Sequence, residues 1–577
     1  MNNAHIAAQF DLLADLLEFQ GANSFRVRAY RNAARTIGEL SEPISRIVED
    51  SSRKLTDIEG IGKDLAEKCQ VLVETGRLPQ LEELQRKIPQ SVLAMLRIPG
   101  LGPKKAAVIY KELNISTLDD LKQACLDERI RTLKGFAAKT EATILAGIEL
   151  AATADQRVYW AVADTLVQRL LAHMQSVPGI DRLEVAGSYR RGKETVGDID
   201  LLLVADSPDA AMDRLAEFPD LDDVLARGDT KMSIRLVSGM QVDLRVVPAK
   251  SYGAALQYFT GSKEHGVKLR GLAKQKGLKI NEYGVFRVEE DGTETYVAGA
   301  TEEEVYGTLD LPWFPPELRE TRDEFQMAES GIPELITEAD IVGDMHMHTD
   351  ATDGRNTLEE MVEAGIARGY QYVAITDHSQ RVSMAGGLTA ERVRAQWKAI
   401  DALNQKLEGR ILVLKGIECD ILEQGGMDLP DDVLAEADWV IASVHYGQNQ
   451  PKQQITDRIL GALENPHVAI VAHPTGRLIN RRAPYDVDME AVLQCASENK
   501  KFVELNANPA RLDLNDLHAH QAKLRGIPVG INSDAHKVEG FGVMRYGIMQ
   551  ARRAALTKQD VVNTRPWKEI QQLLGRT

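Results

Sequence analysis

The sequence predicts a multidomain chain: an all-helical N-terminal region, a central α/β domain and a C-terminal domain of alternating strands and helices. Its 577 residues exceed what one hydrophobic core usually holds. Up to about residue 150, short helical segments are separated by glycine-containing turns, and after about 155 strand-like runs such as 198–204 alternate with helices. From Ile341 onward, apolar strands alternate with amphipathic helices, which predicts a barrel or a doubly wound sheet.

Composition limits the possible function classes. The four cysteines (Cys69, Cys125, Cys419 and Cys495) stand far apart, which is typical of reduced thiols in a cytoplasmic protein. We expect neither a signal peptide nor a membrane-spanning run, because no long apolar stretch is present. The net charge of −17 argues against nonspecific coating of DNA, although basic patches occur locally, for example at 26–31.

Three glycine turns in the helical region share one pattern, at 58–63, 98–104 and 133–139. Each places an apolar residue before a glycine turn and a lysine near the start of the next helix. This is the helix-hairpin-helix pattern of DNA-binding proteins, because glycine lets the backbone approach a phosphate and the helix start offers free N–H groups. Ordinary helix connections are the alternative, above all for the third turn, where Ala137 replaces the second glycine. The candidate DNA-binding residues are Gly60, Gly62, Gly100, Gly102 and Lys104.

Three acidic residues indicate a nucleotidyltransferase site. Asp198 and Asp200 alternate on one predicted strand and therefore face the same side, and Asp243 lies on a second apolar strand. Converging carboxylates require cations between them, and two Mg²⁺ ions (or Mn²⁺) roughly 3.5–4 Å apart are usual for in-line phosphoryl transfer. The preceding turn at 187–192 offers backbone, hydroxyl and guanidinium donors for a triphosphate. The alternative is a solvated strand end beside an unrelated turn.

The whole chain resembles a bacterial family X DNA polymerase, which is related over its first 310 residues to DNA polymerase beta. The segments 187–200, 258–262 and 280–284 carry the resemblance. It implies that Asp198, Asp200 and Asp243 form the catalytic, metal-binding triad. It also implies that the 187–197 turn binds the triphosphate, that 258–261 packs against the sugar and excludes a 2′-hydroxyl, and that an arginine contacts the template side. These implied nucleotide-binding residues are Gly187, Ser188, Arg191, Gly197, Tyr258, Phe259, Gly261 and Arg270.

Two positions depart from the polymerase beta pattern. Gly266 stands where that pattern has an asparagine that contacts the incoming base, and Gln241 stands where it has an arginine near the primer end. Each change removes a side-chain donor, which would affect rate and nucleotide affinity more than the type of reaction.

Lys68 is a possible lyase nucleophile. It matches the Schiff-base lysine of the small lyase domain of polymerase beta, where an amine attacks the sugar of an abasic site. Simple phosphate binding is the alternative. Asp64, four residues earlier, replaces a lysine of that pattern and would favour a charged, unreactive Lys68.

A metal site is predicted in the C-terminal region, which holds nine of the twelve histidines. Histidines and acids recur at or just after short apolar strands such as 372–376 and 440–444, where barrel folds gather their active sites. His346 and His348 alternate and can face one ion. Mixed nitrogen and oxygen ligands suit Mn²⁺, Zn²⁺ or Fe²⁺.

This region resembles the PHP (polymerase and histidinol phosphatase) domain over about 341–577. The resemblance implies a distorted (β/α)7 barrel with a trinuclear metal site, a bridging Glu418 and attack on a phosphate ester by metal-activated water. The implied ligands are His346, His348, Asp353, His378, Glu418, His445, His473, Asp534 and His536.

Together the resemblances imply a DNA-directed DNA polymerase that fills short gaps in DNA repair, as in base excision repair, with a 3′–5′ exonuclease, a 3′-phosphatase or both. The expected partners are gapped or primer–template DNA and dNTPs, and we expect a monomer. One alternative is a DNA-targeted phosphoesterase with an impaired polymerase half; another is a small-molecule phosphatase. The expected domains are 1–85 (helical, lyase-like), 86–150 (fingers-like helix-hairpin-helix), 151–250 (nucleotidyltransferase palm), 251–315 (thumb-like), 316–340 (linker) and 341–577 (PHP).

Overall fold

The computed structural model divides into two compact units, Met1–Gln156 and Arg157–Thr577. Among the described residues, no helix combines the length and the apolar character that crossing a membrane requires. The structure describes residues 3–39, 44–49, 53–58, 60–75, 77–87, 95, 101, 103–115, 117–138, 140–142, 144–145, 148, 157–289, 291–480 and 482–575.

The N-terminal unit consists of helices joined by turns, with no strand among its described residues, as predicted. Helices α1 and α2 pack along each other around buried side chains that include Phe10 and Tyr30. The elements are α1 (Asn3–Phe19), α2 (Ser24–Glu39), α3 (Ile44–Glu49), η1 (Leu55–Asp57), α4 (Lys63–Thr75), α5 (Pro79–Lys87), α6 (Pro103–Leu113), α7 (Leu118–Leu126) and η3 (Ile130–Thr132).

The second unit begins with a five-stranded sheet in the order β2-β4-β7-β6-β5. Strands β4 and β7 run parallel, and the alternate residues Ile199, Leu201 and Leu203 of β4 are buried in the core with α9 and α11. The elements are β1 (Val158–Tyr159), α9 (Trp160–Met174), β2 (Ile180–Val185), α10 (Gly187–Arg190), β3 (Thr195–Val196), β4 (Asp198–Ala205), α11 (Pro208–Ala216), β5 (Leu221–Arg227), β6 (Lys231–Leu236) and β7 (Gln241–Val246).

A smaller subdomain follows, with a three-stranded sheet in the order β10-β9-β8. Buried Glu302 ties it to α10, because Glu302 accepts hydrogen bonds from Arg190 (2.9 Å) and Arg319 (2.6 Å). Burial raises the pKa of Glu302, but the two arginines outweigh it and bring that pKa to about 2. The elements are η4 (Ala249–Ser251), α12 (Tyr252–Thr260), α13 (Lys263–Gln275), β8 (Leu278–Asn281), β9 (Gly284–Val288), β10 (Glu294–Ala298), α14 (Glu302–Gly307), η5 (Pro316–Leu318), α15 (Glu324–Ser330) and η6 (Glu338–Asp340).

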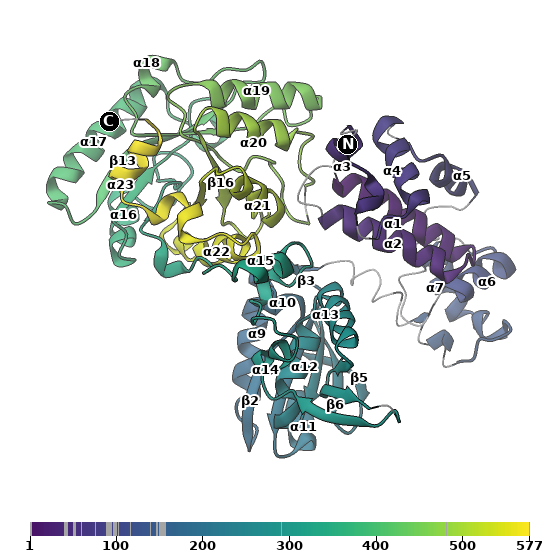
Figure 1. Ribbon diagram of the computed structural model, residues 1–577. Helices are drawn as coiled ribbons and strands as arrows, with labels where there is room; N and C mark the ends of the chain where they lie inside the picture. Colours follow the sequence, from purple (N-terminus) through teal and green to yellow (C-terminus); the bar gives the residue numbers. More distant parts are fainter. Residues whose placement is uncertain are drawn as a thin grey trace. The chain divides into compact units, whose positions relative to one another are not determined.

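The C-terminal part is a seven-stranded parallel sheet whose strands follow chain order from β11 to β17. Helices such as α16, α17, α19, α20 and α21 surround it in Figure 1. The ends of the sheet come together beyond β11 and β17, where Met347 bridges to Ala535 and the His348 backbone N–H donates to the Ala535 carbonyl at 2.8 Å. The distorted (β/α)7 barrel is therefore confirmed, and the strand order does not reverse as in a doubly wound sheet.

The strands of the barrel are β11 (Gly343–Asp344), β12 (Tyr372–Ile375), β13 (Leu412–Asp420), β14 (Trp439–Ser443), β15 (Ile470–Val471), β16 (Phe502–Asn506) and β17 (Val529–Asn532). Its helices are α16 (Leu358–Ala367), η7 (Ser383–Ala385), α17 (Ala390–Leu407), α18 (Asp431–Leu434), α19 (Lys452–Glu464), α20 (Met489–Glu498), α21 (Asp516–Leu524), η8 (Val538–Val543), α22 (Met544–Arg553), η9 (Lys558–Asp560), η10 (Val562–Thr564) and α23 (Trp567–Leu573).

Helix α12 packs so closely on the start of α14 that it needs a glycine. A Cβ atom on Gly253 would lie 2.0 Å from the Thr301 carbonyl carbon, which is backbone and cannot move aside cheaply. We therefore expect Gly253→Ala to lower the free energy of unfolding by about 1–3 kcal/mol. Gly271→Ala is the matched control, because Gly271 is exposed on α13 and a Cβ atom there meets open space. This substitution should raise the free energy of unfolding by about 0.5–1 kcal/mol. Thermal melting of both variants checks the prediction; equal melting temperatures would contradict it.

Candidate active sites

The three predicted triad acids lie on β4 and β7, two adjacent inner strands of the five-stranded sheet. Asp200 on β4 is in register with Asp243 on β7, and Asp198 starts β4. Burial, together with the charges of Asp198 and Asp243, raises the pKa of Asp200 to about 7. Such accumulated negative charge attracts cations, so the arrangement fits a divalent metal site.

Asp243 is held in place by two neighbouring side chains. The Ser233 hydroxyl donates to its Oδ1, and the Gln241 side-chain amide donates to its Oδ2 at 2.9 Å. Gln241 therefore helps to orient a predicted triad acid. Comparison with the polymerase beta pattern, which has an arginine at this position, did not predict this contact.

The turn before β4 lies against the triad. Gly187 has φ +64°, and a Cβ atom there would lie 2.4 Å from Asp200 Oδ2, so only glycine fits without displacing the acid. The Ser188 hydroxyl is buried and has no hydrogen-bond partner within the described residues. An unpartnered hydroxyl beside the acids suits the phosphate-binding role expected of Ser188. Gly197 is also close-packed, because its Cβ would lie 2.8 Å from Arg157 NH1.

Arg191 joins this turn to the segment expected to pack against the sugar. Its Nε donates to Glu320 Oε1 at 3.0 Å, and its NH1 donates to the Thr260 carbonyl. Gly261 lies beside the guanidinium, since a Cβ on it would lie 3.1 Å from Arg191 NH1. The two predicted nucleotide-binding segments are thus brought together by direct contact.

The remaining predicted nucleotide-binding side chains adjoin this segment. The rings of Tyr258 and Phe259 meet edge to face at 5.1 Å, and the Arg270 guanidinium lies 5.8 Å from the Tyr258 ring centre. A Cβ on Gly266 would lie 3.0 Å from Arg270 NH1. Gly266 therefore leaves room for the guanidinium of Arg270 where the polymerase beta pattern places an asparagine.

The first glycine turn leads directly into a helix. Gly60 has φ +89°, Gly62 is exposed with open space around its Cβ position, and α4 begins at Lys63. Of the second predicted turn, Gly100 and Gly102 lie outside the described residues, as does the side chain of Lys104 in the first turn of α6.

Lys68 on α4 forms an ion pair with Asp64 one turn earlier, and its amine lies 5.8 Å from the Tyr30 ring centre. Burial lowers the pKa of Lys68, but hydrogen bonding to Asp64 and Tyr30 raises it above its usual value. The amine is therefore held protonated, which favours phosphate binding over nucleophilic attack.

The barrel brings all nine predicted metal ligands together at the strand ends. Glu418 on β13 is 1% exposed, and its carboxylate lies within 2.9 Å of His378 Nδ1 and 3.1 Å of His473 Nε2. The side-chain nitrogens of His346, His348 and His445 lie 3.5–3.6 Å from the same carboxylate. One carboxylate surrounded by five imidazoles suits the bridging role that the resemblance implies for Glu418.

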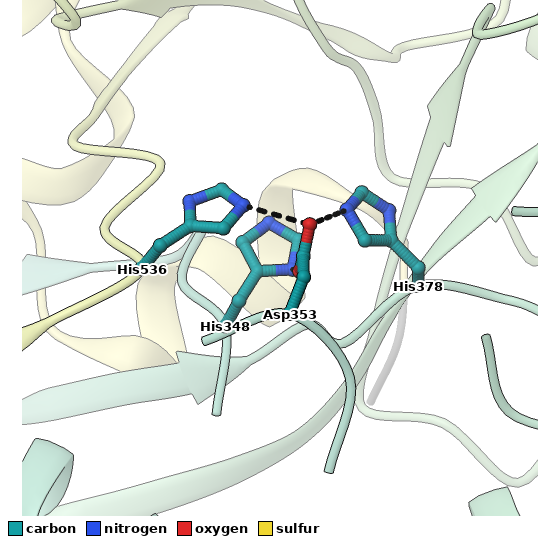
Figure 2. A group of neighbouring side chains, drawn as sticks. All are labelled: His348, Asp353, His378 and His536. Carbon is teal, nitrogen blue, oxygen red and sulfur yellow. Dashed lines mark ion pairs between the residues drawn. The ribbon is translucent and has the colours of Figure 1, made fainter. Parts of the chain in front are cut away.

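The remaining carboxylates lie on either side of Glu418. Figure 2 shows Asp353 between His378 and His536, with each nitrogen 3.5 Å from Asp353 Oδ2. Asp534 lies 3.2 Å from His348 Nε2. The three groups with metal-ligand spacing are His348–Asp353–His378–His536, His346–His348–Asp534 and His378–Glu418–His445.

The electrostatics of this centre favour bound cations. Burial lowers the pKa of His378, but Glu418 and Asp353 raise it to about 10. Burial lowers the pKa of His348 to about 4, helped by His378 and His536. The buried Nε2 of His346 has no hydrogen-bond partner among the described residues and is directed at two carboxylates. A metal ion is the partner that such a nitrogen fits best.

Sequence reasoning missed the residues that orient these ligands. Buried Glu504 on β16 accepts from His346 Nδ1 at 2.7 Å, and Asp420 lies 3.1 Å from His445 Nδ1. Glu504 also accepts from the His473 backbone N–H at 2.9 Å. Both acids interrupt apolar strand sequences, and this was the available signal.

Five family models match this chain. They are a helix-hairpin-helix domain at 1–78, a SAM-like helix-hairpin-helix tandem at 92–149, the DNA polymerase beta palm at 161–241, the DNA polymerase beta thumb at 255–320 and the PHP domain at 344–508. The DNA polymerase/3'-5' exonuclease PolX of Bacillus subtilis is 39% identical over 578 residues, which is 100% of both chains. The chain belongs to the family X DNA polymerases with a C-terminal PHP domain.

Other relatives match parts of this family X chain. DNA polymerase lambda of Rattus norvegicus is 28% identical over 348 residues, covering 55% of this chain and 56% of the relative. A probable phosphatase of Thermoanaerobacter is 31% identical over 235 residues, covering 39% of this chain and 91% of the relative. The helix-hairpin-helix, palm and thumb domains imply binding to DNA, and the PHP domain with its histidine and acid groups implies dependence on metal.

Replacing the carboxylate that orients His346 should weaken metal binding. Glu504→Gln keeps the shape of the side chain but removes the charge that fixes the imidazole, so we expect metal affinity to fall about 10- to 100-fold. Chelator competition followed by metal analysis measures the change. Glu498→Gln is the control, because Glu498 is exposed at the end of α20, and it should leave the metal affinity unchanged. Unaltered affinity in Glu504→Gln would show that Glu504 only supports the fold.

Removing the ion pair at Lys68 should release its amine. Asp64→Asn lowers the pKa of Lys68, and each unit of decrease gives about tenfold more neutral amine near neutral pH. We therefore expect borohydride trapping on abasic DNA to be slow in the unmodified protein and faster in Asp64→Asn. Lys68→Ala should abolish trapping, and exposed Asp119→Asn should not change it. If no variant forms an adduct, Lys68 is not a lyase nucleophile.

Proposed function

We propose that this protein fills short gaps in DNA during repair and processes DNA 3′ ends in its PHP domain, as a 3′–5′ exonuclease, a 3′-phosphatase or both. The observation that carries the proposal is that both sets of predicted ligand residues come together within one chain. Asp198, Asp200 and Asp243 lie on the adjacent strands β4 and β7, and nine histidines and acids come together in the barrel. A DNA-targeted phosphoesterase with an impaired polymerase half is not favoured, because the triad and its adjoining turn are complete.

In the first centre, the residues bind and orient the nucleotide. The triad acids would hold divalent ions, which activate the primer hydroxyl and stabilise the leaving pyrophosphate when bound. Ser188 offers its free hydroxyl to the triphosphate, and Arg191 offers positive charge from the same turn. The backbone of Gly261 and the ring of Phe259 limit the space beside the sugar, which excludes a 2′-hydroxyl.

In the second centre, the ligands arrange charge around a phosphate ester. Glu418 and Asp353 would balance the charge of bound cations, and the imidazoles would supply neutral nitrogen ligands. Bound ions would supply activated water and would polarise the phosphate oxygens. Asp353 and His536 are 36–38% exposed at the side chain, whereas His346 and His348 are buried, so a DNA end reaches the centre from the Asp353 side.

The finer assignments follow from ligand chemistry. We infer Mg²⁺ or Mn²⁺ at the carboxylate triad, and up to three Mn²⁺, Zn²⁺ or Fe²⁺ ions in the barrel, because imidazole suits transition metals. The partners are gapped or primer–template DNA and dNTPs, bound by a monomer. A cytoplasmic location is supported by four buried, free cysteines, since an oxidising compartment favours disulfides.

Separate inactivation of the two centres tests the proposal. Purified protein would be incubated with one-nucleotide-gapped DNA, four dNTPs and Mg²⁺ or Mn²⁺. We expect Asp198→Ala to slow templated extension by at least about a thousandfold and to leave 3′ trimming intact. Loss of a triad acid would remove most of the electrostatic stabilisation of the transition state. His346→Ala should have the opposite effect.

Three outcomes would contradict the proposal. Trimming without extension in the unmodified protein would leave a DNA-targeted phosphoesterase. Turnover of small phosphate esters but not of DNA 3′ ends would assign the barrel to small molecules. Loss of both activities in either variant would mean that the two centres do not act separately.

A further inference from the structure

Helix α22 of the barrel contacts the turn that is proposed to bind the triphosphate in the polymerase site. Arg553, at the last position of α22, is 2% exposed at the side chain. Its NH1 donates to the Arg191 backbone carbonyl at 2.7 Å and to Glu320 Oε1 at 2.9 Å. Glu320, 4% exposed, accepts from Arg191 Nε at 3.0 Å. Arg553 thus fixes both the backbone and, through Glu320, the side chain of Arg191.

The other edge of Arg553 is anchored within the barrel. Its Nε and NH2 contact Asp516 Oδ2 at 2.9 and 2.7 Å, and Arg322 contacts the same oxygen at 2.8 Å. Burial opposes ionisation of Glu320, but Arg553, Lys193 and Arg191 hold its pKa below the usual range. Because Glu320 stays ionised, loss of one cation would leave a buried charge undercompensated.

The rest of α22 is shaped for the same contact. Gln550 donates to the Gly192 carbonyl at 2.9 Å, and a Cβ on Gly192 would lie 2.4 Å from Met549 Cγ. Tyr546 meets Trp160 of α9 edge to face at 5.8 Å. Positions 546, 549, 550 and 553 are spaced three and four apart and so share one helical face.

The opposite face of α22 is embedded in the barrel core. A Cβ on Gly547 would lie 2.7 Å from both Ala507 and Ile531, next to the ends of β16 and β17. Asp534, one of the candidate metal ligands, follows β17 two residues after its end. A single short helix therefore connects the frame of the metal centre to the turn that carries Arg191.

We propose that Arg553 of the PHP domain is a positioning residue for the polymerase reaction, which holds Arg191 in the orientation that binds the incoming nucleotide triphosphate. The inference rests on the proposed triphosphate role of Arg191. With Arg553 present, Glu320 shares its charge among several cations, and Arg191 keeps two bonds, to Glu320 and to the Thr260 carbonyl. Without Arg553, the Arg191 backbone carbonyl loses its hydrogen-bond donor. Glu320, with one cation fewer, then attracts the Arg191 guanidinium more strongly toward itself.

The test compares steady-state gap filling by full-length variants. We expect Arg553→Met to raise the KM for dNTP about tenfold with kcat changed less than about threefold, as for a residue that acts through a packed network. Arg553→Lys should recover part of the affinity. Arg552→Met is the matched control on the same helix, since Arg552 contacts Glu317 and the Ile336 carbonyl instead of the turn, and its KM should be unchanged.

Two further measurements keep the proposal falsifiable if Arg553→Met folds poorly. Glu320→Gln is isosteric and should also raise the KM, while 3′ trimming and the melting temperature report folding. In a double-mutant cycle, Arg553→Met should add little to the effect of Arg191→Lys, because both act at one guanidinium.

The outcomes separate this inference from the proposed function. An elevated KM in Arg191→Lys with an unchanged KM in Arg553→Met and Glu320→Gln would overturn the positioning role alone. Independent, multiplying effects of Arg553→Met and Arg191→Lys would also overturn it. An unchanged KM in Arg191→Lys would overturn the triphosphate role of Arg191, and the inference with it.

Discussion

Closely spaced negative charge, which must be balanced by cations, is the constraint on which both centres depend. Glu418 is 1% exposed and is surrounded by five imidazoles, and the charges of Asp198 and Asp243 add to burial in raising the pKa of Asp200. An isolated carboxylate in such surroundings would cost several kcal/mol, so the fold must supply positive charge or bind it. We propose that metal ions take that role in the two centres, whereas arginines balance the buried acids Glu302 and Glu320.

The arginine-balanced acids hold the second unit together around the polymerase site. Glu302 binds Arg190 and Arg319, and Glu320 binds Arg191 and Arg553. Arg190 and Arg191, which are neighbours in one turn, thus pair with different buried acids. The segment 316–340, expected as a linker, contributes Arg319 and Glu320 to these pairs, and both side chains are buried.

Close backbone approach is the second requirement of the sites. Gly187 touches Asp200, Gly192 touches Met549 of α22, and Gly253 touches the backbone at Thr301. In each case an added Cβ atom would lie only 2.0–2.4 Å from the neighbouring group, which would have to move. The glycines therefore set how near the triphosphate turn, the triad and the barrel can lie, and the charged pairs then lock that spacing.

The sequence by itself determined the domain types and most of the chemistry. Alternation placed Asp198 and Asp200 on one face of a strand, and the recurrence of histidines after apolar strands predicted a metal centre, because strand periodicity and strand ends are local properties. It also marked Asp64 as a partner that would keep Lys68 charged, since residues four apart on a helix are neighbours.

Only the tertiary structure decided how distant residues serve these sites. Glu504, Asp420 and Gln241 contact predicted metal ligands, and Arg553 reaches Arg191 across 362 positions of the chain. The tertiary structure also shows a nearly closed barrel and not a doubly wound sheet, because Met347 forms a bridge with Ala535. Such contacts have no periodic signal, because they depend on which surfaces meet after folding and on the balance of charge buried between them.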